Sequence, residues 1–398
     1  MNTKTFFPIF CCSLSLLCAE PSQPGFRAVD VDTRIEIGYG VTVADVDGDR
    51  KPDLLLADKK QFVWYRNPTW EKFILAENLT KEDNVCIAAA DIEGDGQCEI
   101  AVGAAWNPGD TVNSGAVFYL IPPKDRTQKW EPVALHHEPT VHRMRWVKNW
   151  QNEYELVVAP LHGRGNKNGQ GDGVRILAYK KPADPKQDWT TRVINDALHM
   201  THNLDPVQWD DDPAQELLIA SREGVFVSNW DPDAGALKLT QLSGTESGGA
   251  GEVRLGRLPG GKRFFATVEP MHGTNLVAYT GPEHDGGKQL WTRHVLDSSL
   301  VDGHALACRD LIGTGSDQIV VGWRAMNKPG VKVGIKLFTP LDKEGKDWRM
   351  TLIDDNTMAC EDLTIADLNG DGKLDIVAAG RATKNLKIYF NESGSAAK

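Results

Sequence analysis

Short hydrophobic runs alternate with polar turns along the whole chain, a pattern that predicts β-strands rather than helices. The most regular runs are aromatic and β-branched, and each would be the third strand of a four-stranded unit. They cover residues 62–65, 116–119, 174–179, 224–227, 276–279, 334–338 and 386–390, which makes seven units. Repetition of such a unit is typical of a β-propeller or a solenoid.

A tryptophan precedes the predicted fourth strand in most units. It recurs about every 60 residues, at Trp70, Trp130, Trp189, Trp291 and Trp348. The longer gap between the third and fourth of these markers contains a degenerate copy at residues 237–242. The markers therefore support the same division of the chain into repeated units.

The seventh unit runs into the C-terminus without a fourth strand of its own. Residues 26–32, near the other end of the chain, match residues 348–354 in spacing. An N-terminal strand in the last blade would close a ring, and closure removes the open edges of the sheets. We therefore predict an all-β fold, a single seven-bladed β-propeller of four-stranded antiparallel blades over residues 20–398. A solenoid would need capping ends, and the split repeat argues against it.

Three acidic loops join predicted first and second strands. Each carries acid or amide side chains at positions one, three, five and nine, separated by glycines that allow positive φ. Such loops can gather oxygen ligands around Ca²⁺. An EF-hand would need a glutamate at position twelve and flanking helices, whereas position twelve here is Leu56, Val102 or Ala378 in a strand-like run. The predicted structural Ca²⁺ ligands are Asp45, Asp47, Asp49, Asp53, Asp91, Glu93, Asp95, Glu99, Asp367, Asn369, Asp371 and Asp375.

Hairpin loops of this kind resemble the FG-GAP/VCBS repeats of secreted and integrin-type β-propellers. The resemblance implies the fold and the Ca²⁺ sites, and it says little about function. Acidic turns that bind no ion are the alternative interpretation of the three loops.

Charge and the N-terminal segment restrict the partners and the location. The net charge of −11 at pH 7 argues against nucleic acid and anionic membrane surfaces as partners. After the first residues no apolar run of about 18 residues occurs, so no membrane span is expected. Residues 1–19 read as a secretory signal peptide, which predicts a secreted or periplasmic protein, with a lipid anchor at Cys18 as the alternative.

Beyond this segment four cysteines remain, too few for a disulfide scaffold. A bridge between Cys308 and Cys360 is possible, and the sequence leaves this open.

The ends of the first and second strands should form one face around the central channel, opposite the acidic hairpins. The first-strand starts are Tyr39, Asn84, His142, His202, Glu252, His304 and Glu361. The second-strand ends are Asp58, Trp106, His162 with Arg164, Arg222, His272, Trp323 with Arg324, and Arg381. Five of the ten histidines fall on these two rings beside arginines and acids, and such a cluster suits a divalent metal or acid–base catalysis. A single histidine near a channel is more often structural.

The strings around these histidines, at residues 138–146, 160–165, 200–203, 269–275 and 302–305, are similar to the propeller domain of aldos-2-ulose dehydratases. Those enzymes eliminate water from 1,5-anhydrofructose and glucosone. The resemblance implies a metal-dependent β-elimination from a keto-sugar.

Two functional hypotheses follow. The first is a secreted lyase that acts on a carbohydrate-derived keto compound, such as 1,5-anhydrofructose or a 3-keto-glycoside. Elimination needs a base and a group that stabilises the enolate. The second hypothesis is a non-catalytic, calcium-stabilised propeller that binds glycans or proteins at the cell surface.

The lyase hypothesis assigns roles by residue type. The catalytic candidates are His142, His162, His202, His272, His304, Arg164, Arg222, Arg324 and Arg381, and the substrate-binding candidates are Trp106, Trp323, Tyr39 and Asn203. A second, catalytic metal (Zn²⁺, Mg²⁺ or Mn²⁺) would be held by His142, His202, His304, Glu252 and Glu361.

Overall fold

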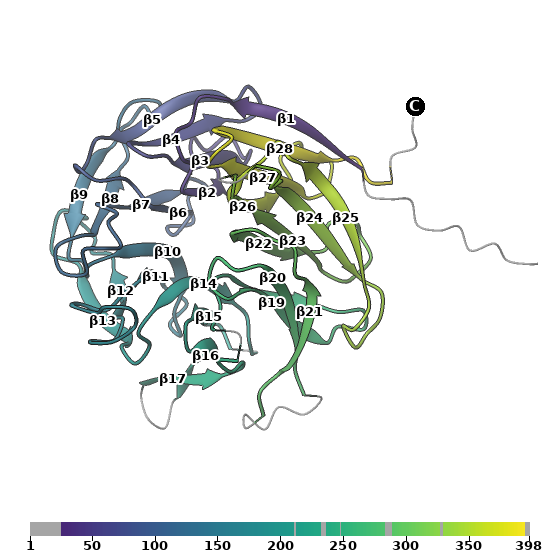
Figure 1. The fold of residues 1–398 in the computed structure, drawn as a ribbon. Helices are drawn as coiled ribbons and strands as arrows, with labels where there is room; N and C mark the ends of the chain where they lie inside the picture. Colours follow the sequence, from purple (N-terminus) through teal and green to yellow (C-terminus); the bar gives the residue numbers. More distant parts are fainter. Residues whose placement is uncertain are drawn as a thin grey trace, which may run out of the picture.

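Seven four-stranded antiparallel sheets form a closed ring around a central channel (Figure 1). The structure is a computed structural model, which describes residues 25–210, 212–231, 236–246, 248–282, 289–326 and 329–394. These residues contain strands and turns but no α-helix. The all-β, seven-bladed prediction is confirmed, while the predicted signal peptide at residues 1–19 lies outside the described residues.

The first six blades each use four consecutive strands. The strands are, blade by blade, β2 (Gly40–Ala44), β3 (Asp53–Ala57), β4 (Gln61–Arg66) and β5 (Glu71–Glu77); β6 (Cys86–Ala90), β7 (Glu99–Ala104), β8 (Ala116–Ile121) and β9 (Glu131–Leu135); β10 (Val141–Lys148), β11 (Tyr154–Pro160), β12 (Ile176–Lys180) and β13 (Thr190–Asn195); β14 (Thr201–Val207), β15 (Glu216–Ser221), β16 (Gly224–Asp231) and β17 (Ala236–Gln241); β18 (Val253–Arg257), β19 (Arg263–Glu269), β20 (Asn275–Thr280) and β21 (Thr292–Asp297); β22 (Gly303–Arg309), β23 (Gln318–Trp323), β24 (Gly334–Pro340) and β25 (Trp348–Asp355).

The seventh blade joins the two ends of the chain. It contains β26 (Cys360–Ala366), β27 (Asp375–Gly380) and β28 (Asn385–Asn391), and its outer strand is β1 (Phe26–Asp32). β1 pairs antiparallel with β28, so that Phe26 lies opposite Asn391 and Val29 opposite Ile388. Figure 1 shows β1, from one end of the chain, lying along β28, from the other. The predicted closure by an N-terminal strand is therefore confirmed.

The burial of each strand follows its place in the blade. All residues of the second strands β3, β7, β15, β23 and β27 are buried, because both faces of these strands pack against neighbouring blades. This explains why their sequences are continuous apolar runs rather than alternating ones. The outer strands β5 and β13 keep several exposed positions. The tryptophan markers begin or immediately precede outer strands, and Trp130 packs with Leu55 and Leu75 of the preceding blade.

One polar residue at the start of the second strand fastens the hairpin in five blades. Asp53 Oδ2 accepts a hydrogen bond from the backbone N–H of Val46 at 2.9 Å, and Asp375 Oδ2 accepts one from Leu368 at 3.0 Å. The equivalent residues in three other blades accept from the same loop position; they are Glu99, Glu216 and Gln318. These hairpins need a buried acceptor there because the loop N–H groups point inward, away from water.

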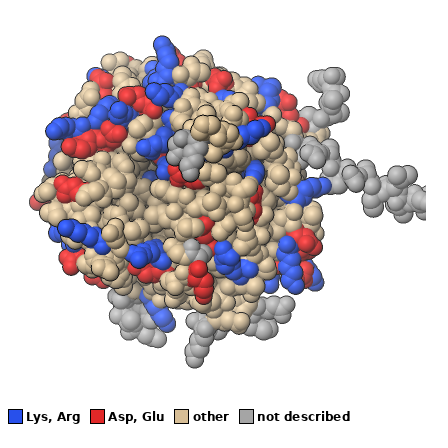
Figure 2. Space-filling view, in the orientation of Figure 1, with Lys and Arg blue, Asp and Glu red and all other residues tan. Residues whose placement is uncertain are grey.

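The cysteines of the propeller do not form disulfides. Cys86, Cys98, Cys308 and Cys360 are all free and buried, so the bridge that the sequence left open between the last two is absent. Among the described residues no helix is long and apolar enough to cross a membrane. Acidic and basic residues are interspersed over the face shown in Figure 2.

Candidate functional site

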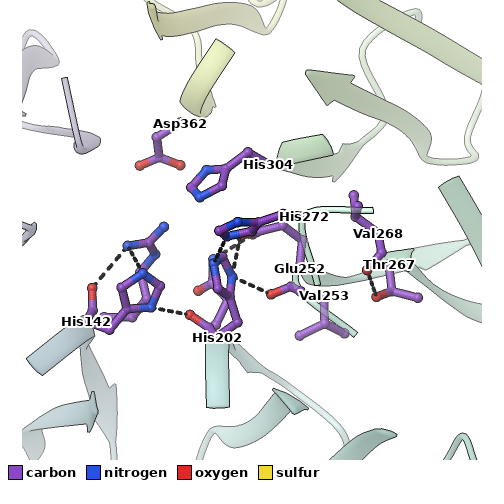
Figure 3. Close-up of polar contacts among 12 residues, drawn as sticks. His142, His202, Glu252, Val253, Thr267, Val268, His272, His304 and Asp362 are labelled. Carbon is purple, nitrogen blue, oxygen red and sulfur yellow. Dashed lines mark hydrogen bonds and ion pairs between the residues drawn. The ribbon is translucent and has the colours of Figure 1, made fainter. Parts of the chain in front are cut away.

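Four predicted site residues occupy β-bulges at the starts of innermost strands. The pairing register shifts at His142 in β10, at His202 in β14, at His304 in β22 and at Glu361 in β26. A bulge adds one residue to a strand and redirects its side chain. All four residues are at most 5% exposed, and the three histidines converge near the centre of the ring (Figure 3).

Backbone carbonyl groups of the next blade hold these three imidazoles. Nδ1 of His142 lies 2.7 Å from the carbonyl oxygen of His202, and Nδ1 of His202 lies 2.8 Å from that of Gly251. Nδ1 of His304 is hydrogen-bonded to the carbonyl oxygen of Glu361. Because a carbonyl oxygen only accepts, each Nδ1 carries the proton, and the Nε2 lone pair of each ring is left for a cation or a proton donor.

His202, His272 and His304 form a three-histidine group. One ring nitrogen of each lies within 4.8 Å of those of the other two. His272 follows β19 in the left-handed region, with φ of 56°, and its side chain is 38% exposed. Its Nε2 lies 2.7 Å from Nε2 of His202. Since Nε2 of His202 is unprotonated, Nε2 of His272 donates this hydrogen bond.

Two arginines and two acids continue the network from His272. Arg324 donates from Nη2 to Nδ1 of His272 at 3.3 Å and from Nη1 to Glu361 at 2.5 Å. Arg381 donates to the other oxygen of Glu361 at 3.0 Å. Asp302 accepts from Nε of Arg324 at 3.0 Å through Oδ2. Its buried Oδ1, 3.6 Å from Nδ1 of His272, has no hydrogen-bond partner among the described residues.

Glu252 supplies a second buried acceptor beside the histidines. Its Oε2 accepts a 2.6 Å hydrogen bond from the side chain of Asn203. Its Oε1 lies 3.3 Å from Nδ1 of His202, yet it has no hydrogen-bond partner in the described part of the chain. Burial raises the pKa of Glu252. Asn203, predicted to bind substrate, therefore orients this carboxyl group.

The histidines are neutral at physiological pH. Burial is the main cause that lowers the pKa of His142, His202 and His304 well below the ordinary value. Burial, followed by the charge of neighbouring His202 and of Arg324, lowers the pKa of His272 to about 2. Neutral imidazole is the form that binds metals or accepts protons.

The predicted ligand set changes in two places. His142 lies beside the group, but its Nε2 accepts from Arg143 at 3.2 Å, and the indole of Trp106 stacks on its ring at a centroid distance of 4.9 Å. His272 takes its place in the three-histidine group. Glu361, a second of the five predicted ligands, accepts hydrogen bonds from Arg324 and Arg381. In the structure both residues hold neighbouring side chains, and their role as metal ligands stays a prediction.

Other predicted residues lie on the same face but outside this group. The half-buried ring of His162 makes no hydrogen bond within the described residues. Arg164 pairs with Glu138 at 3.3 Å, and the exposed Arg222 donates to the carbonyl of Asn168. Further predicted residues with partners elsewhere are Tyr39, which donates to Asp83 at 3.1 Å, and Trp323, which donates to the Lys332 carbonyl at 2.7 Å.

Trp323 is not placed to stack on a sugar. Its side chain is only 6% exposed and belongs to a hydrophobic core cluster with residues of blades 5 and 6. Trp106 is partly buried and remains the stacking candidate.

The acidic loops lie where the sequence predicted them, between first and second strands. In the first loop, oxygens of Asp45, Asp47 and Asp49 lie within 4.8 Å of one another. No such group is found in the other two predicted loops, among the described residues. The ninth residues, Asp53 and Asp375, direct oxygens to backbone N–H groups. Their main observed role is thus to fasten the hairpin.

Sequence reasoning missed three features of this architecture. Two of them are Asp302 and Arg143. Asp302 lies two residues before His304 and Arg143 directly follows His142, so their closeness to predicted histidines in the sequence was the available signal. A further acidic group, Asp210, Asp212 and Glu216, lies in the hairpin of blade 4. Its side chains keep the spacing, with Gln208 at position one and Glu216 at position nine. However, Asp211 stands where all three other loops have glycine and Pro213 where two of them do, so the pattern did not find it.

Comparison with known families supports both resemblances. Residues 114–282 match the family described as the aldos-2-ulose dehydratase β-propeller domain. Residues 37–102 match the FG-GAP-like repeat and contain the first two acidic loops. The first match includes His202 and His272 and ends before His304. Comparison with curated proteins gives no match.

Solved structures show the same architecture at low sequence identity. A chain in the crystal structure of the mitotic checkpoint complex is 12% identical, with a TM-score of 0.56 over 98% of both chains. A chain in the crystal structure of BBS1N in complex with ARL6DN, soaked with mercury, is 15% identical, with a TM-score of 0.55 over 96% of this chain and 100% of that one. At these identities the likeness shows the fold alone.

Proposed function

Starting from a propeller related to that of aldos-2-ulose dehydratase and to FG-GAP repeats, we propose that this protein is a lyase that eliminates water or an alcohol from a keto-sugar. The observation that carries the proposal is the convergence of His202, His272 and His304 from three blades. Three neutral imidazoles, those of His202 and His304 buried, lie beside two buried carboxylate oxygens that have no hydrogen bond among the described residues, an arrangement that is costly to assemble unless it binds something.

The donor set fits a divalent metal. Three imidazole nitrogens suit Zn²⁺ or Mn²⁺ better than Mg²⁺, which prefers oxygen ligands. His202, His272 and His304 would hold the ion, while Glu252 Oε1 lies 3.3 Å from Nδ1 of His202, on the side of the ring that faces away from the ligand nitrogen. A bound metal would polarise the substrate carbonyl as a Lewis acid.

The arginines supply fixed positive charge for the enolate. Arg324 is held by Asp302 and Glu361, so it needs no reorganisation when negative charge develops next to His272. Arg381 shares Glu361 and lies on the same side of the network. Its ring contact with Tyr39, at 5.3 Å from guanidinium carbon to ring centroid, keeps it at the edge of the site.

Proton abstraction next to the carbonyl is best assigned to His162. Both ring nitrogens of His142 are occupied, by the His202 carbonyl and by Arg143. The ring of His162 has no hydrogen bond among the described residues, and burial lowers its pKa, so it is a neutral base at physiological pH. Trp106, next to His142, would stack on the apolar face of the sugar.

The test is a direct assay with candidate substrates. Wild-type protein would be incubated with 1,5-anhydrofructose and with 3-keto-glycosides, with Zn²⁺ or Mn²⁺ supplied, and the enone product followed by its ultraviolet absorbance. We expect product from wild type and from His136→Ala, whose exposed histidine lies outside the site. The His202→Ala, His304→Ala double variant should give none. Absence of product from every keto-sugar would contradict the proposal and leave a binding propeller as the remaining hypothesis.

The acidic hairpins have a separate role in this proposal. We propose that they bind Ca²⁺ and stabilise the blades, with Asp45, Asp47 and Asp49 as the best-formed ligand group. The hairpins lie at the opposite ends of the first strands from the histidines, so they take no part in the chemistry. A secreted or periplasmic location, as the N-terminal sequence predicts, would suit such sites.

A further inference from the structure

A second polar centre lies in the central channel, on the hairpin side of the histidine group. A cavity of about 230 Å³ is lined by residues from the innermost strands of the blades. Its lining includes Ala90 and Arg309, the last residues of β6 and β22, next to the hairpins. None of the histidines lines it. The cavity therefore adjoins the proposed catalytic site, and Arg143, which also donates to His142, borders both.

The lining has an excess of positive charge. It contains four arginines but two carboxylates, namely Arg143, Arg145, Arg254 and Arg309 with Asp205 and Asp362. Each arginine donates from Nη1 to the carbonyl of the residue before it, at 2.6–3.1 Å for the four. A guanidinium has five N–H donors, so most of each fork is left available, although Arg143 also donates to Nε2 of His142 at 3.2 Å.

The carboxylates do not neutralise Arg143 and Arg145. Both oxygens of Asp362 accept backbone N–H groups, from Val41 at 2.9 Å and from Leu363 at 3.0 Å. Asp205 lies 4.0 Å from Arg254, which is also 3.7 Å from Glu252. Across the described ranges, neither Arg143 nor Arg145 forms an ion pair with a carboxylate.

Charge inside a protein is normally paired, because an isolated buried ion loses its hydration. Arg143 is only 5% exposed. Burial, followed by the charge of Arg254, lowers the pKa of Arg145, and the charges of Asp362 and Asp205 oppose this shift only in part. Arg143 and Arg145 thus have carboxylates in their surroundings but, among the described residues, none at ion-pair distance.

We propose that the channel cavity binds a small oxyanion, a phosphate, a sulfate or the carboxylate of a sugar acid, between the guanidinium groups of Arg143, Arg145 and Arg254. Arginine forks match the paired oxygens of these anions. A liquid water molecule occupies about 30 Å³, so the cavity admits an oxyanion with a few waters. Arg309, at the hairpin end, would attract the anion into the channel.

Binding would be measured by isothermal titration calorimetry with sodium phosphate, sodium sulfate and sodium glucuronate at constant ionic strength, in the absence of keto-sugar and of added metal. We expect saturable binding of at least one of these anions to wild type. Arg145→Gln should weaken it about ten-fold or more, because a charge-assisted hydrogen bond is lost. Arg27→Gln, which removes an exposed ion pair with Glu392 on the outer strand, should leave it unchanged.

Arg309→Gln provides a second variant, because this exposed residue can be replaced without opening the buried channel. This variant should also lower the affinity for the anion, mainly because the anion associates more slowly. No saturable binding to wild type would overturn the proposal, as would equal affinity in wild type, Arg145→Gln and Arg309→Gln. Sulfate could also raise the melting temperature of all variants equally while calorimetry shows no binding. That result would mean that sulfate stabilises the fold because it is excluded from the protein surface, and it would count against a specific site. None of these outcomes depends on the lyase proposal.

Discussion

Nε2 of His202 and Nε2 of His272 lie 2.7 Å apart, although Nδ1 of His202 already holds its proton toward the carbonyl of Gly251. Two lone pairs would repel at this distance, so the proton between the rings belongs to His272. A cation bound by both Nε2 atoms would take the place of this proton, and His272 would then not have to be protonated at Nε2. The pair is therefore the most direct point at which metal binding can be tested.

The first prediction concerns metal content. Wild-type protein dialysed after loading with Zn²⁺ or Mn²⁺ should retain tightly bound metal, measured by mass spectrometry of the elements. The His202→Ala, His304→Ala double variant should lose it, because two of three imidazole ligands are gone. His136→Ala is the matched control and should retain the metal. Equal retention in the double variant would place the metal elsewhere.

The second prediction concerns Asp302. If Nε2 of His272 held a metal, the ring proton would sit on Nδ1, the hydrogen bond from Arg324 would be lost, and Asp302 Oδ1, 3.6 Å from Nδ1, would be the acceptor. Asp302→Asn should therefore weaken metal affinity by roughly 10–100-fold, as is usual for a partner that orients a ligand. A competition titration with a chelating dye measures this change. Unchanged affinity with a normal melting curve would show that His272 is not a ligand.

The third prediction concerns the pair between Arg324 and Glu361. Arg324→Gln removes one of two cations from a carboxylate that is 2% exposed, and it should cost about 3 kcal/mol in the free energy of unfolding. Denaturant titration measures the loss. The exposed pair of Arg27 is the control, and Arg27→Gln should cost no more than about 1 kcal/mol. If Arg324→Gln matched that control, the buried network would not stabilise this face.

The fourth prediction concerns the first acidic hairpin. Chelation of Ca²⁺ should lower the melting temperature, since an ion present at 100 times its Kd stabilises the folded state by about 2.7 kcal/mol. Asp49→Ala should reduce this Ca²⁺-dependent shift, while Glu131→Ala on the outer strand β9 should not. Lyase activity well below the melting temperature should hardly change. Loss of turnover in Asp49→Ala with a normal melting curve would place the chemistry at the hairpins.

The fifth prediction concerns pH. Burial raises the pKa of Glu216 to about 7 from the ordinary 4.5. The folded state thus holds this proton more tightly than the unfolded state, so the stability it contributes is complete below pH 4.5 and is lost as pH rises through 7. Glu216→Gln copies Gln318, the residue that fastens the hairpin of blade 6. Urea titrations with a chelator present would measure the free energy of unfolding between pH 4.5 and 7, and the variant should lack the part of the decline that Glu216 causes. A decline equal to that of wild type would contradict the raised pKa of Glu216.

The sequence by itself determined the fold, because the physical causes of the fold are local or periodic. Second strands that are buried on both faces must be continuous apolar runs, such as residues 54–56 of β3. A ring must hide its edges, so the missing strand of the last blade had to come from residues 26–32. The position of His202 and His304 at strand starts also followed from this order, and it placed them on one face.

Only the tertiary structure decided which of these residues meet. A bulge adds one residue without leaving a mark in composition, so the redirection of His142, His202 and His304 could not be seen in the sequence. The carbonyl groups that fix their protons come from the neighbouring blade, 60 residues further on for His142 and 49 for His202. The entry of His272 into the group depends on a loop conformation with positive φ. Such contacts join blades rather than neighbours in the chain, and the packing of the ring alone determines them.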